Sequence, residues 1–185
     1  MKVTVFLADD SDETTITCAN ADVTAKQLCA EMAKKEGLRP ESHGLFSLWI
    51  VGNELGTSRK RTEGGGGANW SVGTAELQLK PDQDLLESVE KFPRYVEKYT
   101  HRKVSDVEIR WRFVYKREAM VRLETDRKVK DPNAIRLLYL EAVANVLSTR
   151  YPLVNENDAV YLAAIQMQID NGDHTPEVHK AGFLM

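Results

Sequence analysis

The sequence is poor in the features that mark membrane-spanning and disulfide-bonded proteins. Only two cysteines, Cys18 and Cys29, occur in 185 residues, too few for a disulfide framework. The longest uncharged apolar stretch is far shorter than the roughly 20 residues that a membrane-spanning helix needs. No basic and then apolar leader is visible before the first predicted strand, so we expect no secretion. The length suits one large domain or two small ones, and a reducing cytoplasm is the expected compartment.

Patterns for catalysis and metal binding are also missing. The four histidines are scattered, and no Gly-x-Ser-x-Gly or His-Glu-x-x-His pattern occurs. The acidic segment 9–13 lacks the central glycine of an EF-hand, which favours a turn. Gly64–Gly67 are not followed by Gly-Lys-Ser/Thr, which favours an inserted loop over a phosphate-binding one. We therefore predict no enzyme, no cofactor and no metal site.

The first half of the chain has the pattern of a β-grasp lobe. Alternating apolar residues predict strands at Lys2–Leu7 and Thr14–Cys18, joined by the acidic turn into a hairpin. Further strand-like runs follow at Leu45–Val51 and 75–79, on either side of a glycine-rich insertion at about 53–73. Strand, strand, helix and strand is the opening order of a ubiquitin-like fold.

The predicted helix of this lobe has a clear apolar face and a clear end. Ala25, Leu28, Cys29 and Met32 fall at helical spacing and form one stripe to pack on the sheet. The helix is expected to end at the segment 35–40, because a glycine that can adopt the left-handed conformation is followed there by a proline that forbids continuation.

A locally basic segment follows in a chain whose formal net charge is −3. Between Arg94 and Lys130 lie twelve Lys/Arg against six Asp/Glu. Within it, 107–117 alternates as a strand, with Ile109, Trp111 and Phe113 on one face. Aromatic and arginine residues also interleave in nucleic-acid-binding proteins, but a buried strand with a charged outer face needs no ligand, so we expect no nucleic acid. The candidate membrane-binding or partner-binding residues are Arg102, Lys103, Arg110, Arg112, Lys116 and Arg117.

The last part of the chain is predicted to be helical. Asp131 and Pro132 form a helix start, an N-cap acceptor followed by proline. The helix that follows is rich in apolar residues, and we expect it to be largely buried. A second helix is predicted from near Asn157 to Gly172, and a third start appears at 175–177.

Taken together, the two halves resemble a FERM domain. The resemblance implies an α+β fold, with a ubiquitin-like first lobe at 1–105, a connector at 106–130, and the start of an acyl-CoA-binding-protein-like helical lobe at 131–185. Within the family, 48–51 and 77–81 are most similar to divergent adaptors of the Krev-interaction-trapped and iRhom-binding FERM protein type. The motifs that carry the resemblance are Arg112–Tyr115, Arg136–Leu140, Asn145–Pro152, Ala159–Gln168 and Gly172–His179.

The resemblance implies an adaptor or scaffold rather than an enzyme. Its expected partners are membrane-protein tails or cytoskeletal proteins, with anionic phospholipid as a further candidate, at the inner face of the plasma membrane or the cytoskeleton. One alternative is small-GTPase recognition by the ubiquitin-like lobe; Lys2, Lys26, Lys34 and Lys35 favour it, and the acidic segment 9–13 opposes it. Another is that the chain is a fragment of a larger FERM-containing signalling protein.

Overall fold

The computed structural model describes residues 1–18, 22–55, 74–100 and 108–177. The chain divides into two compact units, Met1–Ala144 and Asn145–Met185. The glycine-rich insertion lies almost entirely outside the described residues. No helix among the described residues is both long and apolar enough to cross a bilayer.

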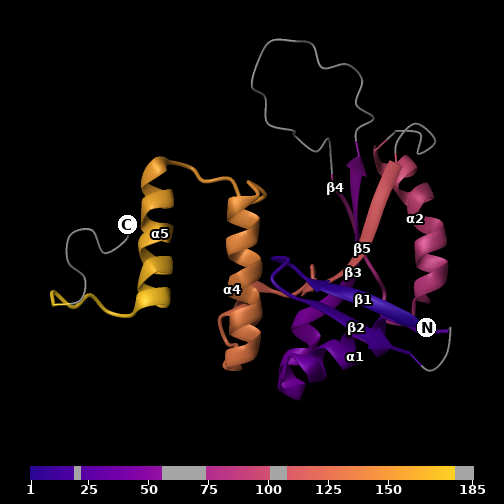
Figure 1. Cartoon of the computed structure of the whole chain (residues 1–185), viewed down its shortest axis with the longest axis horizontal. Coiled ribbons are helices and arrows are strands. Elements are labelled where there is room, and N and C mark those ends of the chain that lie inside the picture. Colours follow the sequence, from indigo (N-terminus) through magenta and orange to yellow (C-terminus); the bar gives the residue numbers. More distant parts are fainter. Residues whose placement is uncertain (19–21, 56–73, 101–107, 178–185) are drawn as a thin grey trace, which may run out of the picture. The chain divides into compact units, whose positions relative to one another are not determined.

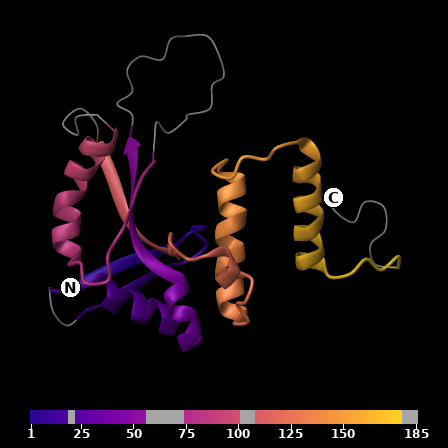
Figure 2. The ribbon, with the colours of Figure 1, turned by 180° about the vertical axis from the view of Figure 1, so that it is seen from behind.

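The first unit is built on a five-stranded mixed sheet in the order β2-β1-β5-β3-β4 (Figures 1 and 2). β1 and β2 are antiparallel, β1 and β5 are parallel, and β3 is antiparallel to both β4 and β5. The α+β fold with a ubiquitin-like lobe, predicted from the sequence, is thereby confirmed. The strands are β1 (Lys2–Leu7), β2 (Glu13–Thr17), β3 (Phe46–Leu55), β4 (Thr74–Gln78) and β5 (Glu108–Arg117).

Helix α1 (Ala25–Lys35) packs on one face of this sheet. Thr24 and Gln27 form a capping box that pairs two N–H groups at its start, and Gly37 follows its end with a φ of 66°. Leu28 and Met32 of the predicted apolar stripe are buried in the core formed with strands β1, β3 and β5. The short helix η1 (Pro40–Leu45) leads from α1 into β3.

The structure places β5 in the middle of the sheet, whereas the expected division at residue 105 put it in a connector. Val5 of β1 pairs with Phe113, and Ile50 of β3 pairs with the same residue from the other side. The sequence predicted a strand at 107–117 but not its place between β1 and β3 in the sheet. Periodicity identifies a strand, but it does not show which distant strands pair with it.

Helix α2 (Leu85–Thr100) was not predicted. Asp84 accepts a hydrogen bond from the backbone N–H of Glu87 at 2.9 Å and so caps its first turn. Phe92 and Val96 are buried at helical spacing, which the sequence also shows. Pro93 lies inside the helix and normally argues against one, because it removes a backbone donor.

Helix α4 (Pro132–Leu147) follows the short helix α3 (Leu123–Asp126) and begins where the sequence predicted. The expectation that α4 is largely buried is wrong: only Ala134 and Leu137 are buried, and Ile135 is 48% exposed. When apolar residues occur on all sides of a helix, the sequence does not show which side packs on the core. Predicting burial from the apolar composition of α4 therefore gave too high a value.

Helix α5 (Glu156–Asn171) lies within the second unit. Asn155 caps it through Asp158, and Gly172 follows it with a φ of 75°. None of its residues is buried. The third helix start was predicted at 175–177, where the described residues end. Any helix after residue 177 would lie outside the described residues.

Asp131 fastens the start of α4 to the loop after α1. Its carboxylate accepts hydrogen bonds from the backbone N–H of Arg39 at 2.8 Å and of Asn133 at 3.1 Å. Burial alone raises the pKa of this carboxyl. The backbone N–H groups and the Ser42 hydroxyl outweigh that effect and bring the pKa below its usual value. The resulting stabilisation is present above the ordinary carboxyl pKa and is lost as the pH falls through the lowered one.

We expect Asp131→Ala to lower the free energy of unfolding by about 3 kcal/mol, because several buried N–H groups lose a charged acceptor. Urea denaturation at neutral pH measures this. Asp82→Ala removes the same charge from an exposed loop position and serves as the control, with an expected change within about 0.5 kcal/mol. Equal effects of the two substitutions would contradict the anchoring role.

Candidate partner-binding surface

Three of the four predicted basic residues of β5, namely Arg110, Arg112 and Lys116, lie on the face of the sheet opposite α1. Phe113 and Tyr115 point into the core, so alternation puts positions 110, 112, 114 and 116 on the outer face. The register places Arg112 opposite Val51 and Lys116 opposite Ser47. Neighbouring β1 contributes Phe6, which pairs with Val114. The outer face therefore combines cations with aromatic and aliphatic side chains.

Arg112 is held by a bidentate ion pair. Its two terminal nitrogens lie 2.8 and 2.9 Å from the two carboxylate oxygens of Asp10, in the turn between β1 and β2. Its guanidinium also lies 5.3 Å from the centre of the Phe6 ring. About a third of the Arg112 side chain stays exposed. A ligand that used Arg112 would have to share it with Asp10.

Lys116 is more deeply enclosed. Its ammonium pairs with Glu76 of β4 and lies 4.3 Å from the centre of the Trp49 ring. The exposed fractions of the Lys116 and Glu76 side chains are only 10% and 20%. Val51 and Val114 beside them are buried. Lys116 therefore acts chiefly within the sheet, and its charge is compensated there.

Arg117 belongs to another set of contacts, at the junction with α3 and α4. Its guanidinium donates to Asp126 at 2.6 and 3.1 Å and to the carbonyl of Val121 at 2.8 Å. Its backbone N–H donates to Glu141 of α4 at 2.7 Å. Burial raises the pKa of the Glu141 carboxyl, against the lowering effect of this hydrogen bond and of nearby Lys116.

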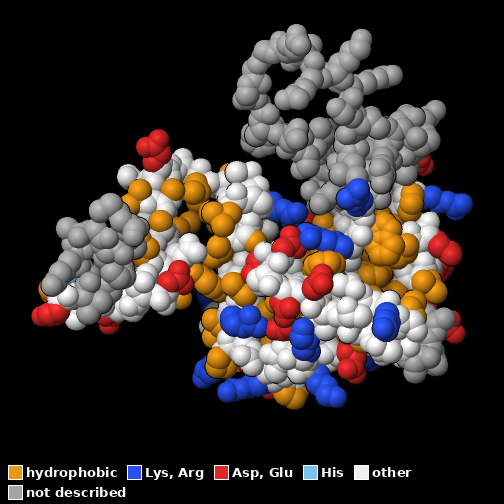
Figure 3. All heavy atoms as spheres, viewed as in Figure 1, with side chains coloured by type: hydrophobic (Ala, Val, Ile, Leu, Met, Phe, Trp, Pro, Cys, Tyr) orange, Lys and Arg blue, Asp and Glu red, His pale blue; other side chains and the backbone are white. Residues whose placement is uncertain are grey.

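The structure thus brings three of the six predicted basic residues onto one face. These are Arg110, which is exposed, with Arg112 and Lys116; Arg117 lies apart from them. Arg102 and Lys103 fall outside the described residues. Acidic and basic side chains alternate over the visible part of the sheet, without one continuous basic area (Figure 3). The local excess of cations in the sequence is therefore partly cancelled in space by Asp10, Glu76 and Asp126.

Sequence reasoning missed the residues that complete this surface. Asp10 and Glu76 are far from β5 in sequence, and Trp49 reaches Lys116 only through the pairing of β3 with β5. The alternation of Ser47, Trp49 and Val51 in the sequence could have identified one face of a strand. The partner of that face depends on register, which the sequence alone does not give.

Two features bear on metal binding and on nucleophilic chemistry. The described residues include no group of three or more His, Cys, Asp or Glu side chains that could hold a metal ion. Burial raises the pKa of the Cys29 thiol to about 11, so Cys29 is protonated at neutral pH and is a poor nucleophile. The surface described above can bind a partner through charge, aromatic contact and apolar contact.

Comparison with known proteins points to one family. Residues 124–184 match the model of the FERM central domain. FERM domain-containing protein B of Dictyostelium discoideum is 36% identical over 67 residues, which are 36% of this chain and 14% of that protein. Human FERM domain-containing protein 8 is 25% identical over 175 residues, which are 94% of this chain and 33% of that protein.

The fold agrees with these matches. A crystal structure of the complex of the FERM and C-terminal domains of Drosophila Merlin aligns with 100% of this chain and 48% of its own length, with a TM-score of 0.61 and 15% identity. The matches together support a FERM domain. The chain spans about a third of the length of human FERM domain-containing protein 8.

We expect the Lys116–Glu76 pair to contribute to stability. Lys116→Met and Glu76→Gln should each lower the unfolding free energy by about 2 kcal/mol, and the double variant should reveal a coupling of about 1 to 2 kcal/mol, because little water screens the pair. The exposed Lys35–Asp12 pair is the control, with an expected coupling below about 0.5 kcal/mol. Additive single effects at Lys116 and Glu76 would contradict this interpretation.

Glu141→Gln tests the raised carboxyl pKa. As the pH rises, the unfolded chain ionises Glu141 first, so the wild type loses stability between the ordinary carboxyl pKa and the raised one. The variant avoids this loss, and its advantage in urea denaturation should grow from pH 4 towards pH 7. Glu124→Gln makes the same change on the exposed surface of α3 and should follow the wild-type profile. A Glu141→Gln profile parallel to the wild type would refute the assignment.

Proposed function

We propose that this chain is a non-catalytic FERM-type adaptor or scaffold module. It joins membrane-protein tails or cytoskeletal partners to the inner face of the plasma membrane. The observation that carries the proposal is a ubiquitin-like sheet followed by helices in which residues 124–184 match the FERM central domain. FERM domain proteins are generally adaptors without catalytic activity. Within this proposal, the segments 48–51 and 77–81 suggest a divergent adaptor of the Krev-interaction-trapped and iRhom-binding type.

In this proposal the basic residues contribute unequally to attraction towards an anionic leaflet. Arg110 is exposed and contributes most among the described residues. Arg112 contributes less because Asp10 already pairs with it, and Lys116 and Arg117 mainly hold the fold together. Arg102 and Lys103 complete the candidate set. Each exposed cation adds on the order of 1 kcal/mol near an anionic surface, so the attachment is weak and sensitive to salt.

Small-GTPase recognition is a second candidate, because β2 ends the sheet and offers an edge strand. The groove between β2 and α1 is lined by Asp22 and Glu31, however, and Lys35 is paired with Asp12. An acidic groove repels the acidic switch regions expected of such partners. Titration of labelled small GTPases with this chain decides between the two roles.

Co-sedimentation with vesicles tests the adaptor proposal. We expect the chain to bind vesicles that contain phosphatidylserine but not pure phosphatidylcholine vesicles, and to detach as salt is raised. Arg110→Gln should weaken binding about fivefold, which corresponds to about 1 kcal/mol, and Arg112→Gln should weaken it less.

Arg136→Gln is the matched control for these vesicle measurements. Arg136 lies on α4, where it pairs with Glu36 of α1, away from the β5 face. Equal binding to both kinds of vesicle would overturn the membrane part of the proposal. Equal losses from Arg110→Gln and Arg136→Gln would overturn the assignment to β5.

A further inference from the structure

The two neighbours of β5 accompany it over very different lengths. β3 pairs with it over ten residues, from Glu108 to Arg117. β1 pairs with it only from Phe113 to Tyr115. Within the described part of the chain, no strand lies against the β1 side of β5 from Glu108 to Trp111. The start of β1 and the first half of β5 therefore separate and leave a wedge between them.

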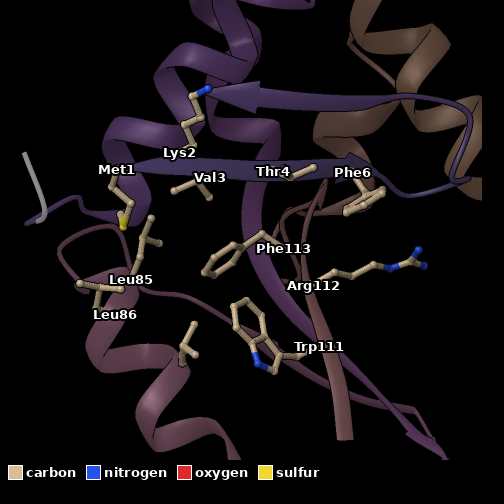
Figure 4. Close-up of a pocket in the computed structure, with 11 residues that line it drawn as sticks. Met1, Lys2, Val3, Thr4, Phe6, Leu85, Leu86, Trp111, Arg112 and Phe113 are labelled. Carbon is tan, nitrogen blue, oxygen red and sulfur yellow. The ribbon is translucent and has the colours of Figure 1, made fainter. Parts of the chain in front are cut away.

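This wedge is an apolar groove with a volume of about 390 Å³, which we call the β1–β5 groove. Its floor is formed by buried side chains from three elements: Val3 of β1, Phe113 of β5 and Leu85 of α2. Figure 4 shows Phe113 and Trp111 directed towards α2, with Leu85 and Leu86 on the far side of the hollow. Helix α2 closes the bottom of the wedge, so the groove opens at the surface.

Large apolar side chains remain exposed at the rim of the groove. Trp111 is 44% exposed and Leu86 is 45% exposed, although buried apolar residues lie beside both. The Trp111 ring meets Phe113 edge to face, with 5.5 Å between the ring centres. Exposed apolar residues that gather around a concave site mark binding surfaces, and tryptophan is prominent among residues that dominate binding energy.

The charges around the groove favour an acidic ligand. Lys2 and Arg112 are the charged residues that line it, and none of the lining residues is acidic. The Lys2 and Arg112 side chains both point away from the hollow in Figure 4, and Arg112 is already paired with Asp10. Lys2 is exposed at the β1 end. A carboxylate of a ligand would therefore meet Lys2 at the rim, outside the hollow.

We propose that the β1–β5 groove binds an extended segment of a partner protein, which places one large apolar side chain in the groove and a neighbouring carboxylate near Lys2. An extended segment fits because the β1 side of β5 offers a strand edge next to a single pocket. A bound helix requires a row of pockets along its apolar face. This inference rests on the proposed protein-binding role and identifies the β1–β5 groove as the place where the partner binds.

Selection of peptides tests the groove on the full chain. Random twelve-residue peptides displayed on phage are selected against the wild type, and the enriched peptides are synthesised and titrated by fluorescence polarisation. We expect an aromatic or large aliphatic residue next to Asp or Glu. Leu86→Glu should weaken binding by more than about tenfold, and Lys2→Glu by about fivefold. Met120→Glu is the control, because Met120 is 83% exposed and does not line the groove.

NMR places the bound peptide. The indole N–H signal of Trp111, identified by Trp111→Phe, should shift when the peptide is added, and that of Trp49 should not. If the peptides bind the wild type and Leu86→Glu equally well, the assignment of the binding site to the β1–β5 groove is wrong. The proposed adaptor role is not affected by that result. Failure to enrich any peptide, while vesicle binding persists, also overturns the groove alone. A concentration-dependent dimer abolished by Leu86→Glu would assign the groove to a second copy instead.

Discussion

The first unit depends on the pairing of β5 with strands from both ends of the lobe. Val5, near the start of the chain, and Ile50, in β3, both pair with Phe113, so the hairpin β1–β2 and the hairpin β3–β4 meet only through this strand. These contacts join segments 108 and 63 residues apart in sequence, and the core that they close offsets the entropy lost in closing such long loops. The helix α2 that precedes β5 packs into the same core through Phe92 and Val96.

The position of β5 also explains why the outer face of the sheet is less basic than the sequence segment 94–130 suggests. A β-strand directs alternate side chains to opposite faces, so Arg112 and Lys116 share a face with the strands on either side. Glu76 comes from β4, one strand beyond β3, and Asp10 comes from the turn between β1 and β2. Partly buried cations need such partners, because an unpaired charge in a poorly hydrated site is costly.

Local features were predictable from the sequence because they depend on local physics. Gly37 ends α1, Asp131 begins α4 and Gly172 ends α5, each at a position marked by its backbone or capping preference. The position of β5 and the burial of α4 depend on distant contacts, which periodicity does not specify. The same limit applies to the site: the basic residues were visible, whereas their acidic partners and the groove required the register of the sheet.

The unequal pairing of β5 links the fold to its capacity for recognition. If β1 followed β5 along its whole length, Trp111 would pack beneath a neighbouring strand and the wedge would close. Instead only the last three residues of β1 pair with β5, and α2 fills only part of the gap, with Leu85 buried and Leu86 left 45% exposed. The sheet therefore keeps a continuous core on its α1 side while an apolar concavity stays open next to a strand edge. In the proposed binding role, this concavity discriminates between partners by its shape and by the charge of Lys2 at its rim.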